Sequence, residues 1–162
     1  MALLLVFAPT APARLSRDGA TEFRAHVFPV AGPHSVRGYT GEFGAPRNGG
    51  RTHEGFDIVA ACRTPLLAAA TGRVVRAGYD PLLYGNHLLI HGQGERRSYL
   101  YSHLIRPAAV RRGDRVWAGQ RVGAVGKTGN ARTVGCHLHF EIHRRGWPID
   151  PESALDRWDR DG

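Results

Sequence analysis

Short apolar runs, separated by turns rich in glycine, fill the chain from about residue 36 onward. Runs of this length between turn residues are typical of β-strands. Apolar side chains spaced with the period of a helix occur only near the end of the chain. The sequence therefore predicts an all-β domain built from many short strands.

The expected strands lie at residues 55–60, 65–69, 72–77, 87–91, 98–104, 115–117, 121–125 and 137–143. One helix is expected at residues 151–158, with Ser153 as its N-terminal cap.

We expect one domain, because 162 residues are enough to bury a single core. The domain is placed at residues 36–152, between a polar lead at 14–35 and a C-terminal tail at 153–162. Residues 1–13 carry an apolar run followed by Ala11-Pro12-Ala13, which is typical of a secretory cleavage site, although a basic start is missing. The run is too short to span a bilayer, so we expect a signal-peptide remnant, export and no stable membrane insertion.

Two short segments place metal-binding side chains on one face of a strand. His53 and Asp57 are four positions apart, and His137 and His139 are two apart, so each pair points the same way if the segments are strands. The chain has nine histidines, and a lone histidine is usually a surface or core residue. Here apolar side chains alternate with the polar ones, as in a half-buried strand. Three of the four side chains would suit one zinc ion with a position left open for water.

A second zinc signature starts at the same place and is excluded. His53-Glu54 matches the beginning of the helical His-Glu-x-x-His motif, in which the glutamate is a general base. The fifth residue here is Asp57, and Gly55 favours a strand over a helix. Glu54 then faces away from His53, so we place it in solvent or behind the metal ligands.

The formal net charge of +8 indicates a polyanionic partner. The arginines are scattered, without the basic stripe and interleaved aromatic residues of a nucleic-acid-binding protein. We therefore expect no nucleic acid, and a general attraction to an anionic surface such as a bacterial wall that carries acidic polymers.

Cys62 and Cys136 are the two cysteines of the chain. In an exported protein they would most simply form a disulfide, and the alternative is a pair of buried free thiols. Cys136 would face away from the histidines that follow it in a strand, which argues against a role as a zinc ligand.

Several stretches resemble the lysostaphin-type (LytM-type) zinc endopeptidases that cut bacterial peptidoglycan. Over residues 38–152, and in the family's order, these are His53-x-Gly-x-Asp57, Thr64-Pro65, Ala68 to Val74, Tyr84-Gly-Asn86, Tyr101-Ser-His-Leu104, Val110-x-x-Gly-x-x-Val116-x-x-Gly-Gln120, Gly126-x-Thr-Gly129 and Gly135-Cys-His-Leu-His-Phe-Glu141. The resemblance implies a mostly antiparallel, two-layer β domain with a groove and a short C-terminal helix.

The resemblance also implies roles for individual residues. His53, Asp57 and His139 would bind zinc, while His103 and His137 would flank the open position as acid and base. His103 shares its strand parity with Tyr99 and Tyr101. The residues expected to contact substrate are Arg47 and Tyr101, and Arg37 and Arg132 are alternative candidates for the rim of the groove.

The function implied is a secreted or wall-associated zinc endopeptidase that hydrolyses cross-links or stem peptides of peptidoglycan. The alternative is a relative that binds the wall or activates an amidase without catalysis. Degenerate members of the family lose metal ligands or catalytic histidines, and this chain keeps all five. A carrier domain or a nucleic-acid-binding module would leave the histidine pairs unexplained.

Overall fold

The structure, a computed structural model, describes residues 26–161. The strands are β1 (His34–Val36), β2 (Phe56–Ala60), β3 (Pro65–Leu67), β4 (Gly72–Asp80), β5 (Gly85–Gly92), β6 (Arg97–Leu104), β7 (Arg115–Val116), β8 (Arg121–Ala124), β9 (His137–Arg144) and β10 (Trp147–Ile149). The helices are α1 (Gly38–Gly41) and α2 (Glu152–Asp161), with 3-10 turns η2 (Asn48–Gly50) and η3 (Gly129–Thr133). The predicted signal-peptide remnant lies outside the described residues.

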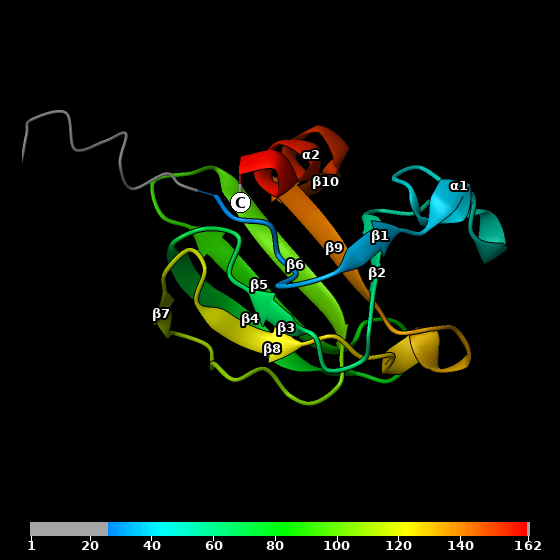
Figure 1. The fold of residues 1–162 in the computed structure, drawn as a ribbon, viewed down its shortest axis with the longest axis horizontal. Helices are drawn as coiled ribbons and strands as arrows, with labels where there is room; N and C mark the ends of the chain where they lie inside the picture. The colour runs from blue at the N-terminus through cyan, green and yellow to red at the C-terminus, as the bar shows by residue number, and fades with distance from the viewer. Residues whose placement is uncertain (1–25, 162) are drawn as a thin grey trace, which may run out of the picture.

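The strands form two antiparallel sheets in two layers. The large sheet has the order β1-β2-β9-β6-β5-β4-β7, with β10 beside β9, and β3 pairs with β8 in a small sheet. Figure 1 shows β3 and β8 lying across one face of the large sheet. The prediction of a mostly antiparallel, two-layer β domain with a short C-terminal helix is confirmed. The short strands β1 and β10, three residues each, were not predicted.

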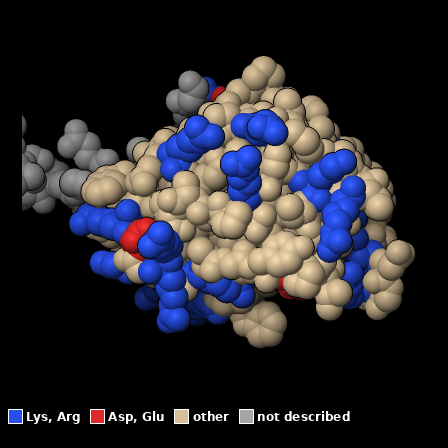
Figure 2. Space-filling model, turned by 90° about the horizontal axis from the view of Figure 1, so that it is seen from below, with Lys and Arg blue, Asp and Glu red and all other residues tan. Residues whose placement is uncertain are grey.

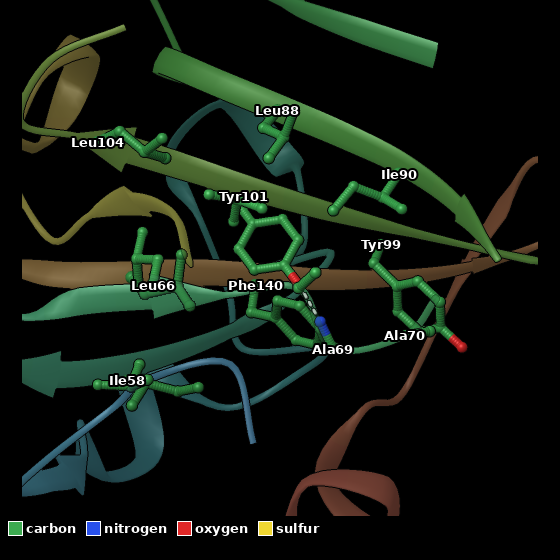
Figure 3. Packing of buried hydrophobic residues seen from close by; sticks show 14 of the residues in the cluster. Ile58, Leu66, Ala69, Ala70, Leu88, Ile90, Tyr99, Tyr101, Leu104 and Phe140 are labelled. Atoms are coloured by element: carbon green, nitrogen blue, oxygen red, sulfur yellow. Dashed lines mark hydrogen bonds between the residues drawn. The ribbon is translucent and has the colours of Figure 1, made fainter. Parts of the chain in front are cut away.

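The core lies between the two layers. Tyr101 and Phe140 point from the large sheet toward Leu66 of the small sheet, while Tyr99 lies nearer Ala70 (Figure 3). All four of the larger side chains, Leu66, Tyr99, Tyr101 and Phe140, are fully buried. Side chains alternate along a strand, so the other face of β6 and β9 is left for polar residues. Each large buried apolar side chain contributes about 1.5–3 kcal/mol to folding, so this layer fixes the register in which the polar face is presented.

The described end of the predicted N-terminal lead packs onto the domain. β1 pairs with β2, and Val30 forms an isolated bridge with Leu66. The backbone N–H of Val27 donates to the carbonyl of Ala69 at 3.1 Å. Residues 26–35 therefore belong to the same packed unit as the sheets.

Helix α2 closes one end of the core with Leu155 and Trp158, both buried. Its cap is Asp150, whose Oδ1 accepts the backbone N–H of Glu152 at 2.9 Å, so the expectation that Ser153 caps the helix is wrong. No helix among residues 26–161 is long and apolar enough to cross a membrane.

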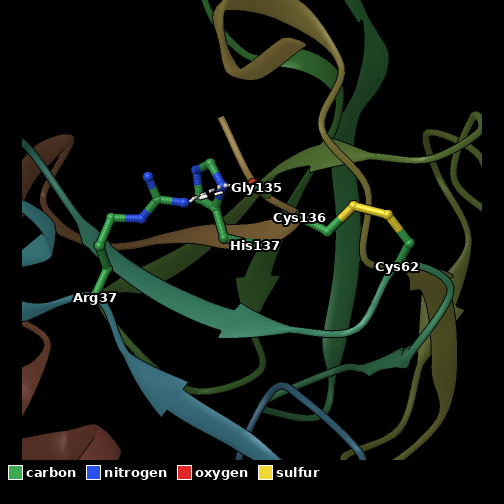
Figure 4. Close-up of a disulfide and its surroundings, with 5 residues drawn as sticks. All are labelled: Arg37, Cys62, Gly135, Cys136 and His137. Carbon is green, nitrogen blue, oxygen red and sulfur yellow. Dashed lines mark hydrogen bonds between the residues drawn. A yellow bond between two sulfur atoms is a disulfide. The ribbon is translucent and has the colours of Figure 1, made fainter. Parts of the chain in front are cut away.

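The predicted disulfide between Cys62 and Cys136 is present, with the two Cα atoms 5.3 Å apart (Figure 4). It joins the segment after β2 to the residue before β9 and so fastens one end of the pair that carries Asp57 and His139. A cross-link over 74 residues restricts the unfolded chain, which stabilises the fold by about 4 kcal/mol in the chain-entropy model.

Candidate metal centre

Neighbouring strands bring Asp57 and His139 together. The two residues are direct register partners in the antiparallel pair of β2 and β9, so their side chains share one face. His53 lies in the loop before β2 and not in a strand, contrary to the prediction. Its backbone is held in place by hydrogen bonds with Ala45 and Gly44, each 2.8 Å long. The loop therefore places the His53 side chain next to Asp57 and His139, which the paired strands hold.

His53, Asp57 and His139 form a triangle of donor atoms. The distance from His53 Nε2 to His139 Nδ1 is 2.8 Å, and each of these nitrogens lies 3.1 Å from Asp57 Oδ1. In a tetrahedral zinc site the ligand atoms lie about 3.3 Å apart, because each is about 2.0 Å from the ion. The three atoms would need to separate by only a few tenths of an ångström, so the site fits zinc.

Hydrogen bonds on the far side of each imidazole select the tautomer that can bind a metal. His53 Nδ1–H donates to the carbonyl of Glu42 at 2.8 Å. His139 Nε2–H donates to Glu141 Oε1, also at 2.8 Å. In that tautomer the nitrogens that face Asp57 present their lone pairs, as metal binding requires. Three acceptors at one point repel one another unless a cation lies between them.

When no metal is bound, a proton on His139 can take the place of the cation, and the pKa values of the metal-free groups describe this protonated state. Burial alone would raise the pKa of Asp57, but hydrogen bonds from His139 and His53 hold it well below its usual value. Burial alone would lower the pKa of His139, yet its hydrogen bonds to Asp57 and Glu141 raise it to about 9. The carboxylates stay ionised and attract a positive charge to the site.

Glu141 supports the metal ligand and was given no role from the sequence. It is fully buried, and it bonds His139 Nε2 on one side and His143 Nε2 on the other. Burial raises the pKa of its carboxyl, but these two hydrogen bonds outweigh burial and lower it to about 2. The signal was available, because residue 141 follows His139 by two positions and so lies on the same face of the strand.

Gly55 leaves the space that His139 and Glu141 occupy. A Cβ atom at this position would lie 2.6 Å from the carbonyl oxygen of Phe140, 2.7 Å from His139 Cε1 and 2.8 Å from Glu141 Cγ. Real contacts of a Cβ atom are longer than these distances, so any side chain here would push the ligand aside. This close approach explains the glycine between His53 and Asp57.

His103 and His137 lie beside the triangle with one nitrogen each turned into the groove. Their Nδ1–H groups donate to the carbonyls of Thr128 and Gly135, both at 2.9 Å. The ring centroids are 4.9 Å apart, and His137 Nε2 is 3.8 Å from Asp57 Oδ1. Both histidines are buried, and their Nε2 lone pairs are free to exchange a proton with a bound molecule.

Burial keeps both histidines neutral. It lowers the pKa of His103 to about 3, with further lowering by the charges of His139 and His137. Burial is also the largest cause of the lowered pKa of His137. A neutral imidazole can accept a proton, which is the first requirement of a general base.

The backbone of His103 breaks the alternation of β6. Tyr101 faces the core, and Ser102 is the register partner of His139 on the groove side. His103 has a φ of 64°, and Leu104 returns to the core. Strand parity with Tyr101 is therefore not what directs His103. The left-handed backbone conformation of His103 turns its side chain into the groove. This conformation costs about 1 kcal/mol or more for a residue other than glycine.

The expected substrate contact of Tyr101 is wrong. Its side chain is fully buried in the core, and its hydroxyl accepts the backbone N–H of Ala69 at 2.7 Å (Figure 3). The alternation of β6 places this ring on the face opposite the groove.

Arg47 and Arg37 both line the groove, and Arg37 lies next to His137. Arg47 donates to the carbonyl of Thr40 at 2.7 Å and places its other terminal nitrogen 3.5 Å from Asp57 Oδ2. The guanidinium of Arg37 is 3.2 Å from His137 Nδ1 and donates to the carbonyl of Gly135, which also accepts the His137 proton (Figure 4).

Arg132 does not line the groove. It borders a separate depression beside Cys62 and Lys127, so of the two candidates for the rim only Arg37 is among the lining residues. The groove itself has a volume of about 720 Å³. Its walls include Tyr84, Asn130 and Glu54, which places Glu54 close to the metal site.

Comparisons with known proteins agree with this geometry. The model for Peptidase family M23 matches residues 51–151. The chain is 36% identical over 103 residues to the peptidoglycan DD-endopeptidase ShyA of Vibrio cholerae, covering 63% of this chain and 23% of that protein. It is 34% identical over 110 residues to the murein hydrolase activator NlpD of Escherichia coli, covering 67% of this chain and 27% of that protein. The chain thus spans less than a third of the length of either relative.

The structure of the antimicrobial peptidase lysostaphin from Staphylococcus simulans has the same fold. The match has a TM-score of 0.67 at 27% identity and covers 83% of this chain and 56% of that one. Since the family match spans most of the chain and includes all five groove residues, and the fold agrees as well, this chain belongs to peptidase family M23.

Proposed function

We propose that this protein is a zinc-dependent endopeptidase that hydrolyses peptide bonds in the stem peptides or cross-links of bacterial peptidoglycan. The observation that carries the proposal is the complete set of five side chains in one groove. Three donor atoms converge within 3.1 Å of one another, and two neutral histidines stand beside them. The DD-endopeptidase among the relatives acts on peptidoglycan by its name, which supports this class of substrate.

His53, Asp57 and His139 would hold the metal. Zinc bound there would polarise the scissile carbonyl and make a water molecule acidic enough to act as a nucleophile near neutral pH. Glu141 and the carbonyl of Glu42 hold the two imidazoles in the tautomer that this requires.

His103 and His137 would move the protons. One Nε2 accepts a proton from the attacking water, and a histidine returns a proton to the nitrogen of the leaving amine. The two rings are close enough to serve the same bond, with centroids 4.9 Å apart. Their Nδ1 hydrogen bonds to backbone carbonyls keep each Nε2 directed into the groove.

Arg47 would contact the substrate. Its guanidinium lies in the groove within 3.5 Å of Asp57. From there it can hold a substrate carboxylate or stabilise the developing oxyanion through charge-assisted hydrogen bonds.

A second function is favoured by the relatives that are named as activators. The murein hydrolase activator NlpD is 34% identical over the matched region, so a domain of this family can carry a name that denotes activation. Activation would not need the neutral histidine pair, whereas peptide hydrolysis would. The pair is intact and buried here, which favours the enzyme.

We further propose that the protein works outside the cytoplasm. Its disulfide is of the kind that persists in oxidising compartments. Peptidoglycan lies in such a compartment, so the location that the disulfide indicates matches that of the proposed substrate.

Purified peptidoglycan of defined cross-link type provides the test. The zinc-loaded protein should release fragments whose new amino and carboxyl termini, identified by mass spectrometry, come from one type of peptide bond. A sample treated with a chelator should release none, and zinc should restore release. If the loaded protein cleaves no peptide bond but increases the activity of an added amidase, the activator function is correct instead.

A further inference from the structure

An exposed basic surface surrounds the turn that leads into β7. We name it the β7 patch and define it as Arg73, Arg111, Arg112, Arg115 and Trp117. Figure 2 shows basic side chains gathered at the end of the molecule where Figure 1 places β7, with few acidic side chains among them. All five residues of the patch are exposed.

Two arginines of the patch lie directly opposite each other on neighbouring strands. Arg73 of β4 and Arg115 of β7 are direct register partners. Like charges opposite each other on neighbouring strands destabilise a sheet. Arg73 folds over the turn and donates to the carbonyl of Gly113, which places it next to Arg112. The result is four guanidinium groups around one short turn.

The patch has one acidic residue within its turn, Asp114. Within the described part of the chain, none of the four arginines forms an ion pair with a carboxylate. Asp114 lies in the turn, but its Oδ2 accepts the backbone N–H of Arg111 at 2.8 Å and so caps the turn. The surrounding segment 105–135 carries Arg106, Arg111, Arg112, Arg115, Arg121, Lys127 and Arg132 against Asp114 alone.

Trp117 adds a flat apolar surface to the patch. The residue is 55% exposed, and the guanidinium carbon of Arg115 lies 5.7 Å from the centroid of its ring. This is a cation–π contact that orients the arginine beside the ring. A ligand that carries both anionic groups and less polar stretches would meet both parts.

The patch is separate from the groove. The order of the large sheet places β7 at one edge, while β2 and β9 lie near the other. A molecule bound at the patch would leave the groove open to a peptide.

We propose that the β7 patch binds a linear phosphodiester polymer of the cell envelope and so holds the enzyme on the wall while the groove acts on peptides. This proposal rests on the proposed function, which places the protein at the cell wall, where such a polymer is found. Planar guanidinium groups bind phosphate through paired hydrogen bonds, and a repeating anion matches several arginines in a row.

Two other polyanions fit the patch less well. A membrane surface requires a broad apolar face to insert, and the patch offers one large apolar side chain, Trp117. Single-stranded nucleic acid stacks successive bases on several aromatic rings, and the patch offers one ring.

The test measures affinity of the full chain for immobilised poly(glycerol phosphate) by biolayer interferometry at low and high salt. A variant with Arg111→Gln, Arg112→Gln and Arg115→Gln removes three charges from the patch. The matched control, with Arg144→Gln, Arg157→Gln and Arg160→Gln, removes three exposed charges from β9 and α2. We expect the patch variant to lose about 10-fold or more in affinity and to show a weaker salt dependence, and the control to change by less than about 3-fold.

Both variants should keep their melting temperature and their turnover on a soluble cross-linked peptide fragment. Equal losses of affinity in the two variants would show that net charge alone acts, and would overturn the proposal. Tighter binding through the patch to anionic vesicles, or to an oligonucleotide with the same number of phosphates, would overturn the choice of partner. Binding is measured without hydrolysis, so polymer binding in a protein that cleaves no peptide would reject the endopeptidase and leave the patch in place.

Discussion

The metal trio of His53, Asp57 and His139 and the histidine pair of His103 and His137 share one groove, but different parts of the chain hold them. Asp57 and His139 are register partners within the sheet. The histidine pair sits at strand ends and is fixed by hydrogen bonds to the carbonyls of Thr128 and Gly135, in the segments between β8 and β9.

This difference implies that metal binding and turnover can be separated. A change in the trio removes one of the three ligands, so it acts on zinc binding first. A change in the pair leaves the ligand triangle intact and acts on proton transfer. The predictions below test this division, from the largest effect to the smallest.

The largest effect is expected from His139→Ala. This variant loses one corner of the triangle and the partner of Glu141, so zinc content should fall from about one ion per chain to near zero. Metal analysis after gel filtration measures this directly. Retention of a full zinc complement would remove His139 from the site.

The next effect concerns the pair. His103→Ala should lower the turnover number by about 10²-fold or more, the usual size of a lost general acid or base, because the proposed mechanism uses His103 Nε2 to exchange protons with substrate and water. Zinc content should stay at about one per chain. His91→Ala, at an exposed histidine of β5, is the matched control and should keep normal turnover. Normal turnover in the His103 variant would assign both proton transfers to His137.

Glu141→Gln should weaken zinc binding by about 10- to 100-fold, because the amide no longer holds His139 through a carboxylate. Competition with a chelator of known affinity provides the measurement. Glu95→Gln alters another histidine-bound carboxylate, paired with His26 away from the groove, and should leave zinc affinity unchanged. Equal zinc affinity in the two variants would show that Glu141 does not support the ligand.

The smallest effect on the site is expected from Cys62→Ser combined with Cys136→Ser. Loss of the cross-link should reduce the free energy of unfolding by about 2–4 kcal/mol. Zinc content should not change, because the ligand triangle lies within the sheet and its adjoining loop. Turnover should fall more than zinc affinity, since Cys136 adjoins His137. An unchanged unfolding curve would show that the disulfide does not restrain this end of the sheet.

Alternation along strands made much of the sheet and part of the site predictable. It placed His137 and His139 on one face of their strand, and the same pattern would have identified Glu141. The pairing that brings Asp57 beside His139 came from the structure. It also explains the error at Tyr101, because this residue lies with Tyr99 on the apolar side of its strand.

Loop paths and unusual backbone conformations were not predictable in this way. His53 reaches the site from a loop, so its spacing from Asp57 matched the strand rule without a strand. The φ of 64° at His103 follows from the local path of the chain beside Tyr84, whose carbonyl accepts the backbone N–H of His103 at 2.8 Å. No period in the sequence encodes that turn.

The most direct test of the division between trio and pair is zinc content and turnover measured on the same preparation of His137→Ala. His137 and His139 are two positions apart on β9, yet the structure places only His139 in the ligand triangle. We expect about one zinc per chain, an unchanged melting temperature and a turnover number lower by about 10²-fold or more. Loss of zinc in this variant, or retention of normal turnover with zinc bound, would contradict the account.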